Sequence, residues 1–302
     1  MKKIPTLTIG IPAYNEEANI KNLLLTLTTQ KENGFKTEEI LVVSDESRDK
    51  TNKIVKQFNN KLVKLIVNKN RMGQIHCQNL IFKLSRSDIL VLLEADTIPQ
   101  GKNYLANLVN PLVKDNRIEV TQGNIQLSLP RNLFQKMLFY HQRIYLKLVF
   151  SNEKTKNWVC LGRGGKAFSK SFYKNFSWPK NVPEDLYTFL YCKLNNIGYK
   201  YIDESKCLYQ LPSLYKDLLK ERQKIISGKQ ALESCFPPAL LDQYYKKPGS
   251  LKLKMLLSFM VSKPLLCFIY ILYSLRLSRD LENKSFTDLW PSTPSTKKLF
   301  VN

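Results

Sequence analysis

Histidine is scarce in this 302-residue chain, which has only two, and none of its six cysteines forms a C-x-x-C pair. Two histidines cannot build a histidine-rich metal site, and this cysteine spacing favours buried, reduced thiols. No signal peptide precedes the first strand pattern, because residues 1–5 run directly into it. We therefore expect the region that follows to face the cytosol.

Negative charge is also in short supply. The chain has 25 Asp and Glu against 47 Lys and Arg, which gives a net charge of +22. Such a surplus favours an anionic partner: nucleic acid, an acidic membrane face or a phosphorylated substrate. The positive residues form no dense basic block, so a lysine-rich genome composition is the competing explanation.

The first 125 residues alternate short apolar runs with helical patterns. This alternation predicts βαβ units and an α/β fold with a mostly parallel sheet. The predicted strands are 7–12, 39–44, 63–67, 89–93 and 117–127, and the predicted helices are 16–29, 49–58 and 73–84. Asp49 is expected to cap the second helix.

Carboxylates follow the predicted strands. Asp45 follows the second strand, Glu94 and Asp96 follow the fourth, and Glu184 with Asp185 opens a later helix. Parallel strands that end in carboxylates place them on one edge of the sheet, where open α/β sheets bind ligands. Such an edge suits a divalent cation and a phosphorylated substrate, and it leaves one carboxylate to act as a base.

The second half of the chain has a different pattern. Residues 132–150 predict a long helix with aromatic and basic faces, which fits either a core helix or a helix on a membrane surface. Beyond it, the pattern predicts a glycine-rich strand or turn at 161–168, a helix at 185–195, a strand at 199–202 and a helix at 214–232.

Residues 255–275 form the most apolar stretch, long enough to span a bilayer but interrupted by Lys263 and Pro264. A lysine at a helix centre costs about 2.5–3.5 kcal/mol on membrane-insertion scales. A hairpin or an in-plane helix is therefore as plausible as a single span, and a core helix is the plain alternative. Four basic residues would anchor the ends to anionic head groups: Lys252, Lys254, Arg276 and Arg279. The expected organisation is a catalytic domain at 1–235, a helical membrane-associated segment at 236–280 and a polar tail at 281–302.

Two motifs near the N-terminus carry the first family resemblance. Residues 11–17 read Ile-Pro-Ala-Tyr-Asn-Glu-Glu, which by itself fits an ordinary helix capped by Asn15. Residues 43–51 read Val-Ser-Asp-Glu-Ser-Arg-Asp-Lys-Thr. This stretch resembles the Val-Asp-Asp-Gly-Ser-x-Asp-x-Thr motif of inverting GT-A glycosyltransferases of the large family 2 type, at the spacing typical of that family.

Further motifs continue the resemblance, in the family's order, over roughly residues 6–230. Residues 70–79 resemble the Asn-x-Gly…Asn segment, and Glu94-Ala95-Asp96 stands where the family has its Asp-x-Asp metal motif. Residues 164–168 resemble the acceptor-side Gly-x-x-Ala-Phe strand, and Glu184-Asp185 resembles the Glu-Asp motif. Each motif is weak alone, but their shared order makes chance an unlikely source.

The resemblance implies a GT-A, Rossmann-like sheet that binds a nucleotide-diphospho-sugar, most simply a UDP-sugar. It implies that Asp45 accepts from the base, that Asp96, with Glu94, holds Mg²⁺ or Mn²⁺, and that Asp185, beside Glu184, is the general base. The donor would contact Pro12, Ala13, Tyr14, Glu16, Asp45, Arg71, Gly73, Glu94 and Ala95. The acceptor side would include Gly164, Gly165 and Lys224. A hydroxyl of a lipid or cell-surface glycan is the expected acceptor, at the cytoplasmic face of the cell membrane.

Three departures from the family pattern matter. Ser44 replaces the first Asp of the usual pair, and Glu94 replaces the first Asp of the metal motif. Residues 221–225 lack the Trp of the Gln-x-x-Arg-Trp motif found in processive members, which argues for a non-processive enzyme. Arg222 or Lys224 contacts a diphosphate or belongs to a solvated helix face.

Several alternatives stay open. A nucleic-acid-binding protein is disfavoured, since no such module is evident and an acidic edge repels phosphates without a metal. A non-catalytic sugar-nucleotide-binding relative is a second alternative. A nucleotidyltransferase is a third, although residues 7–17 lack its Gly-rich, Arg-containing loop.

Residues 290–297 loosely resemble a segment that follows the membrane helices of membrane-bound relatives. If that segment returns to the site, both flanks of 255–275 lie in the cytosol.

Overall fold

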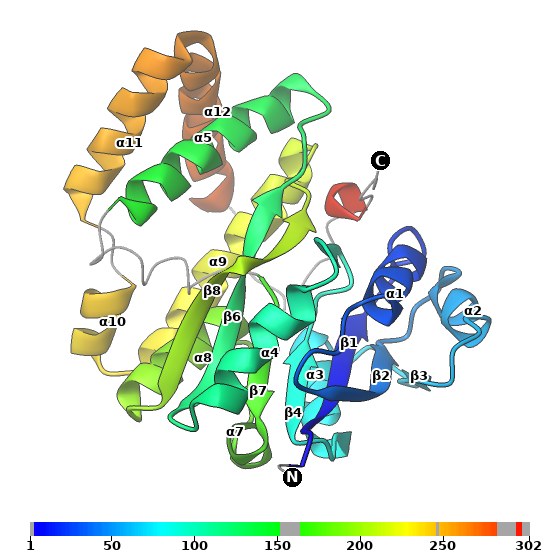
Figure 1. Cartoon of the computed structure of the whole chain (residues 1–302). Helices are drawn as coiled ribbons and strands as arrows, with labels where there is room; N and C mark the ends of the chain where they lie inside the picture. The colour runs from blue at the N-terminus through cyan, green and yellow to red at the C-terminus, as the bar shows by residue number, and fades with distance from the viewer. Residues whose placement is uncertain (1–2, 152–163, 246–247, 283–293, 298–302) are drawn as a thin grey trace.

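The computed structural model describes residues 3–151, 164–245, 248–282 and 294–297. Its centre is an eight-stranded sheet with the strand order β3-β2-β1-β4-β7-β6-β8-β5 (Figure 1). The strands are β1 (Thr6–Ala13), β2 (Lys36–Ser44), β3 (Val63–Val67), β4 (Ile89–Leu92), β5 (Thr97–Pro99), β6 (Ile118–Leu127), β7 (Lys166–Ser169) and β8 (Gly198–Tyr209).

The sheet is mixed. Strands β3, β2, β1 and β4 are parallel neighbours, and β6 is parallel to β8. Strand β7 runs antiparallel between β4 and β6, and β5 pairs antiparallel with β8. This agrees with the predicted mostly parallel α/β sheet and adds two reversed strands. Because β7 is reversed, it begins at the edge where β1, β2 and β4 end.

Helices cover both faces of the sheet. One face packs on α1 (Ile20–Thr28), α2 (Thr51–Lys56) and α4 (Tyr104–Lys114). The other packs on α3 (Gln74–Leu84), α7 (Lys170–Asn175) and α8 (Glu184–Leu194). Alternate residues of β1 and β4 point to opposite faces, so that Val91 joins the first core while Leu90 and Leu92 join the second.

A separate layer of helices lies beyond the β6 and β8 end of the sheet (Figure 1). It consists of α5 (Leu133–Phe150), α9 (Tyr215–Cys235), α11 (Gly249–Ser262) and α12 (Pro264–Glu282), which share a third apolar core. The short helix α10 (Pro238–Tyr244) packs with α8 and α9. A final 3-10 turn, η2, spans Pro294–Thr296.

The expected C-terminal membrane segment requires a correction. Lys263 separates α11 from α12, and Pro264 begins the second helix, so the apolar stretch forms two helices that pack on each other and on α5. Among the described helices, none combines the length and the apolarity that a bilayer span requires. The single-span alternative is therefore wrong for the described residues.

The remaining differences are local. Helix α1 begins at Ile20 instead of residue 16, because Asn15 adopts a left-handed backbone conformation (φ 53°) and the next residues form a turn. Asp49 accepts the backbone N–H of Thr51 at 2.9 Å but stands one residue before the helix cap, Lys50. The predicted strand at 199–202 is the start of the longer β8. Residues 161–163 and 290–293 of the predicted motifs lie outside the described residues.

Candidate active site

The candidate site lies at the edge where β1, β2 and β4 end. Asp45 directly follows β2, and Glu94 and Asp96 lie in the short link between β4 and β5. Glu184 and Asp185 form the first turn of α8. The strand ends and the start of α8 thus bring together carboxylates from three separate parts of the sequence.

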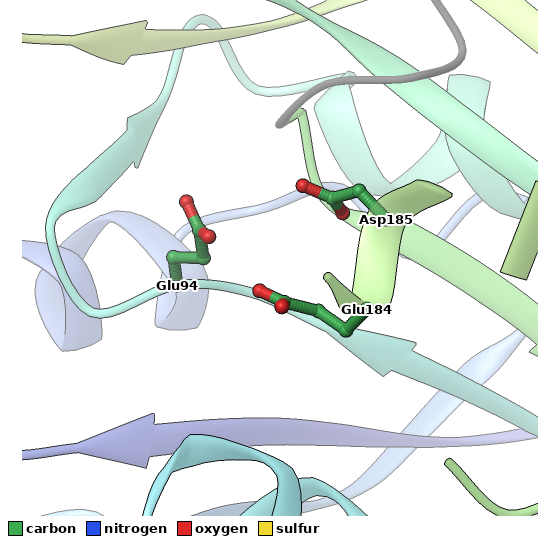
Figure 2. Close-up of side chains that lie close together, drawn as sticks. All are labelled: Glu94, Glu184 and Asp185. Atoms are coloured by element: carbon green, nitrogen blue, oxygen red, sulfur yellow. The ribbon is translucent and has the colours of Figure 1, made fainter. Parts of the chain in front are cut away.

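Three carboxylates form a tight cluster. Glu94, Glu184 and Asp185 each offer an oxygen within 4.8 Å of the others, and Figure 2 shows their side chains converging from the β4 end and the α8 start. Burial raises the pKa of Glu184, Lys224 opposes that rise and Asp185 adds to it. The cluster therefore concentrates negative charge that favours a cation.

Two neighbouring side chains hold the cluster in place. Lys166, the first residue of β7, is buried and forms an ion pair with Asp185. Gln74 at the start of α3 donates from Nε2 to Oε1 of Glu184 at 2.8 Å. A cavity of about 30 Å³, enough for a water molecule, adjoins Glu94, Lys166, Glu184 and Asp185.

These residues fit a divalent cation. Carboxylate oxygens are the ligands that Mg²⁺ and Mn²⁺ prefer, and three lie close enough to share one ion. Lys166 pairs with Asp185 and Lys224 acts on Glu184, so these two lysines offset part of the charge of the three carboxylates. A divalent ion would relieve the repulsion between Glu184 and Asp185.

Asp96, the predicted metal ligand, is not a member of this cluster. Instead its charge acts on Glu16, whose carboxyl is buried just after β1. Burial raises the pKa of Glu16 to about 7, Lys297 counteracts this and Asp96 reinforces it. The cluster shares Glu94 with the predicted metal site, and the role of Asp96 as a metal ligand stays a prediction.

Asp45 organises the loop before α3. Its Oδ1 accepts from Asn68 Nδ2 at 3.0 Å and from the Met72 N–H at 2.8 Å, and its Oδ2 accepts from the Gly73 N–H at 2.8 Å. Gly73 adopts a left-handed conformation (φ 90°), which allows its N–H to point at the carboxylate. The buried Asp45 side chain therefore fixes the loop that carries Arg71.

Tyr14 lies between two cations. The Arg71 guanidinium carbon is 4.0 Å from the centre of the Tyr14 ring, and Lys297 Nζ is 5.6 Å from it. Lys297 also donates to the Tyr14 carbonyl and forms an ion pair with Glu16 at 2.7 Å. The segment at 294–297 thus lies against residues 14–16 near the start of the chain.

Other predicted donor residues lie where β1 and β4 end. Pro12 pairs with Val43 across β1 and β2, and the Ala13 carbonyl accepts the Asp45 N–H at 2.8 Å. Ala95 is buried between Glu94 and Asp96. Their small side chains keep the strand ends compact.

Gly164 and Gly165 serve close packing. Gly165 has a left-handed φ of 67°, and a Cβ there would lie 2.6 Å from Leu93 and would overlap the Tyr104 hydroxyl. The Gly164 carbonyl accepts from that hydroxyl at 3.0 Å. These two glycines therefore allow the chain to pack closely on Leu93 and Tyr104 just before β7 begins.

Helix α9 also lies close to the carboxylate cluster. Gly228 packs on Pro183, which precedes Glu184, and a Cβ on Gly228 would lie 2.9 Å from the proline ring. Lys224, one turn earlier on α9, acts electrostatically on Glu184. Lys224 therefore lies near enough to influence the cluster.

The sequence patterns do not predict the roles of three residues. Lys166, Gln74 and Lys297 lie within the motif ranges 164–168, 70–79 and 290–297, which give them no individual role. A lysine next to a double glycine at a strand start is the one signal that pointed to Lys166. The contacts of Gln74 and Lys297 depend on tertiary structure and leave no local pattern.

Ser44 and Glu46 both depart from the family motif after β2, and each makes a local contact. Ser44 is buried and donates to Ser47 Oγ at 2.9 Å, so it stabilises the turn after β2. Glu46 stands where the family motif has glycine, and it adopts a left-handed conformation (φ 61°). Its Oε2 accepts the Arg71 N–H at 3.1 Å, which offsets part of the backbone strain.

Comparison with solved structures gives the same fold. The chain superposes on a mannosyltransferase from Pyrobaculum calidifontis, solved with GDP-Man and Mn2+, with a TM-score of 0.60 and 17% identity over 92% of this chain and 81% of that one. For glucosyl-3-phosphoglycerate synthase from Mycobacterium tuberculosis, solved with Mn2+, UDP and phosphoglyceric acid, the TM-score is 0.56 at 16% identity, covering 81% of this chain and 80% of that one. The chain thus has the GT-A-like architecture of these structures.

Sequence comparison gives the family. The chain is 30% identical to the probable glycosyltransferase YdaM of Bacillus subtilis (strain 168) over 132 residues, which are 42% of this chain and 31% of YdaM. It is 26% identical to the Escherichia coli UDP-Glc:alpha-D-GlcNAc-diphosphoundecaprenol beta-1,3-glucosyltransferase WfgD over 192 residues, which are 63% of this chain and 71% of WfgD. The match thus spans less than a third of YdaM. The family model for Glycosyl transferase family 2 matches residues 8–176, more than half of the chain, and the chain therefore belongs to that family.

Proposed function

We propose that this protein transfers a sugar from a nucleotide-diphospho-sugar to a hydroxyl acceptor, with inversion at the anomeric carbon. The observation that carries the proposal is the cluster of Glu94, Glu184 and Asp185, between the strand ends and α9. It sits on a chain of glycosyl transferase family 2. A UDP-sugar is the donor we favour.

The strand ends would bind the nucleotide. Tyr14 presents an aromatic ring that lines the base pocket, and Arg71, held against that ring, supplies a positive charge for the diphosphate. Asp45 has two carboxylate oxygens that already accept three protein donors, and a carboxylate offers about four acceptor positions. A ring N–H of the base would share this carboxylate with these donors and with the Cys77 thiol, which also interacts with Asp45.

A divalent cation fits the same edge. Glu94, with Glu184 or Asp96 beside it, would hold Mg²⁺ or Mn²⁺. The ion, when bound, neutralises charge on the diphosphate leaving group. The Mn2+ in the Pyrobaculum calidifontis and Mycobacterium tuberculosis structures supports this choice by analogy.

Asp185 would act as the base. Its carboxylate accepts the proton of the acceptor hydroxyl while that oxygen attacks the anomeric carbon from the face opposite the diphosphate. The ion pair with Lys166 orients Asp185 before the acceptor arrives. One base and one displacement give an inverted product.

We favour a lipid-linked acceptor at the cytoplasmic membrane face. WfgD, by its name, acts on a diphosphoundecaprenol-linked sugar, and a relative from Shewanella sediminis acts on undecaprenyl phosphate. The +22 charge supports an anionic lipid surface as a partner.

A donor screen tests the proposal. Purified protein with Mn²⁺ or Mg²⁺ is incubated with UDP- and GDP-sugars, and nucleotide release is measured with and without EDTA. We expect release from at least one donor that EDTA suppresses. Binding of a donor without any release, in wild type and in the surface control Asp242→Asn alike, would favour a non-catalytic binding protein.

A further inference from the structure

The helical layer contains an open pocket that the proposed catalytic chemistry does not use. It has a volume of about 530 Å³ and lies among α5, α9, α11 and α12. That volume is in the ordinary range for small-molecule sites. Its apolar lining includes Tyr145, Leu251, Met255, Phe259, Tyr270 and Ile271.

The charge at this pocket has one sign. Arg222 from α9 and Lys252 from α11 both line it and are both exposed. Among the described lining residues there is no Asp or Glu, and the other polar ones are neutral serine, glutamine and histidine side chains. An apolar interior with two cations beside it suits a ligand with a long hydrocarbon part and an anionic head.

The pocket adjoins an apolar surface of α12 that is exposed among the described residues. On α12, Leu265, Phe268, Leu272 and Leu275 are each at least half exposed, and they follow one another at helical spacing. Leu275 belongs both to this row and to the pocket lining. A hydrocarbon chain could therefore pass from the pocket onto the exposed row without crossing a polar barrier.

Helix α9 connects the pocket with the candidate active site. Arg222 lines the pocket, and Gly228, six residues later, packs on Pro183 beside the carboxylate cluster. Six helical residues span about 9 Å along the axis. The pocket and the Pro183 end of the carboxylate cluster therefore adjoin the same helix at positions less than two turns apart.

We propose that this pocket binds the hydrocarbon part of an isoprenoid phosphate or diphosphate acceptor, with Arg222 and Lys252 holding its phosphate. The choice of an isoprenoid acceptor rests on the proposed function. The pocket itself rests on its lining, its charge and its position on α9. It accounts for an apolar cavity and an exposed apolar row that the donor site leaves unexplained.

The test measures binding of geranylgeranyl diphosphate in neutral-detergent micelles by titration calorimetry. The pocket variants are the double charge variant R222Q/K252Q and Ser274→Trp, which fills the cavity. The matched controls are Lys254→Gln and Ser262→Trp, two exposed positions on α11 that do not line the pocket. We expect R222Q/K252Q and Ser274→Trp each to weaken binding at least about tenfold, as loss of charge-assisted contacts or of the cavity implies. The controls should change it by less than about twofold.

Equal binding by wild type, both pocket variants and both controls would overturn the proposal, as would absence of binding by wild type. Equally tight binding of phosphatidylglycerol at the same residues would also overturn it, because the pocket would then be a general bilayer contact. Since both residues of R222Q/K252Q are exposed, this variant keeps the test decisive if Ser274→Trp does not fold. Nucleotide release without acceptor is measured in parallel: normal release with lost lipid binding localises the failure to the pocket, and absent release in wild type localises it to the proposed function.

Discussion

Lys297 and Glu16, from opposite ends of the chain, form an ion pair with a separation of 2.7 Å between Nζ and Oε1. The pair lies beside Tyr14, and both side chains are largely removed from solvent. Lys297 therefore adds a second positive charge near the Tyr14 ring, beside that of Arg71.

Loss of this lysine should destabilise the protein. In Lys297→Ala the buried Glu16 carboxylate loses its counter-charge, and breaking such a pair costs about 3 kcal/mol or somewhat less where water enters. Denaturant unfolding at pH 8 measures the effect. The double variant E16Q/K297A serves as the control, because a neutral glutamine does not need the lysine. If Lys297→Ala alone unfolds like wild type, the ion pair contributes nothing to stability.

The pH dependence of stability should carry the signature of Glu16. Its ordinary pKa is 4.5, and the folded protein raises it to about 7, chiefly through burial. The folded state thus binds this proton more tightly than the unfolded state. Glu16 therefore adds stability that is complete below about pH 4.5 and is lost as the pH rises through 7.

Comparison with Glu16→Gln isolates this contribution. We expect wild type to lose on the order of 3 kcal/mol relative to Glu16→Gln between pH 4.5 and pH 8, from 1.36 kcal/mol per pKa unit. Denaturant titrations at several pH values give the difference. A constant difference across that range would mean that the Glu16 pKa is the same in both states.

Gly165→Ala should be strongly destabilising. The new Cβ meets Leu93 and the Tyr104 hydroxyl at a left-handed backbone position, so we expect a loss of about 2–4 kcal/mol. Gly249→Ala at the start of α11 is the matched control, since no atom lies within 4 Å of its Cβ position. The control should change stability by less than about 1 kcal/mol. Similar thermal unfolding of the two variants would contradict this role of Gly165.

Asp45→Asn should loosen the loop before α3. The asparagine amide group cannot accept the backbone N–H groups of both Met72 and Gly73, so one buried donor loses its partner at a cost of about 2 kcal/mol. Nucleotide affinity should fall together with stability. Titration calorimetry with UDP and GDP measures the affinity, and thermal unfolding measures the stability. Asp242→Asn is the control in both measurements. Unchanged affinity for both nucleotides would remove Asp45 from the donor site.

Local patterns predicted most of the secondary structure near the donor side. Strand β3 matches its predicted bounds, because three of its five residues, Val63, Ile66 and Val67, have β-branched side chains that favour strands. The three-residue β5 is too short for a periodic signal, and it is fixed by pairing with β8. The reversal of β7 also depends on pairing, with β4 and β6, that no local pattern reports.

The candidate site was predictable only in part. Glu94, Glu184 and Asp185 were all identified from the sequence, but their mutual proximity depends on how α8 packs beside the β4 end. The family motif points to Asp96 as a metal ligand, and a motif does not report which other carboxylates lie close to Glu94. The contact between Lys297 and Glu16 depends on tertiary structure alone. The sequence therefore raises the return of residues 290–297 to the site but does not predict this ion pair.

Asp185→Asn tests the central claim most directly. The variant is compared with wild type and Asp242→Asn, with Mn²⁺ and the donor identified in the screen, by the initial rate of nucleotide release and by donor affinity. The account predicts unchanged donor affinity and a rate that falls by about 10²–10⁴-fold, the usual contribution of a positioned base. A rate within a few-fold of wild type at saturating donor would contradict the assignment of Asp185 as the base.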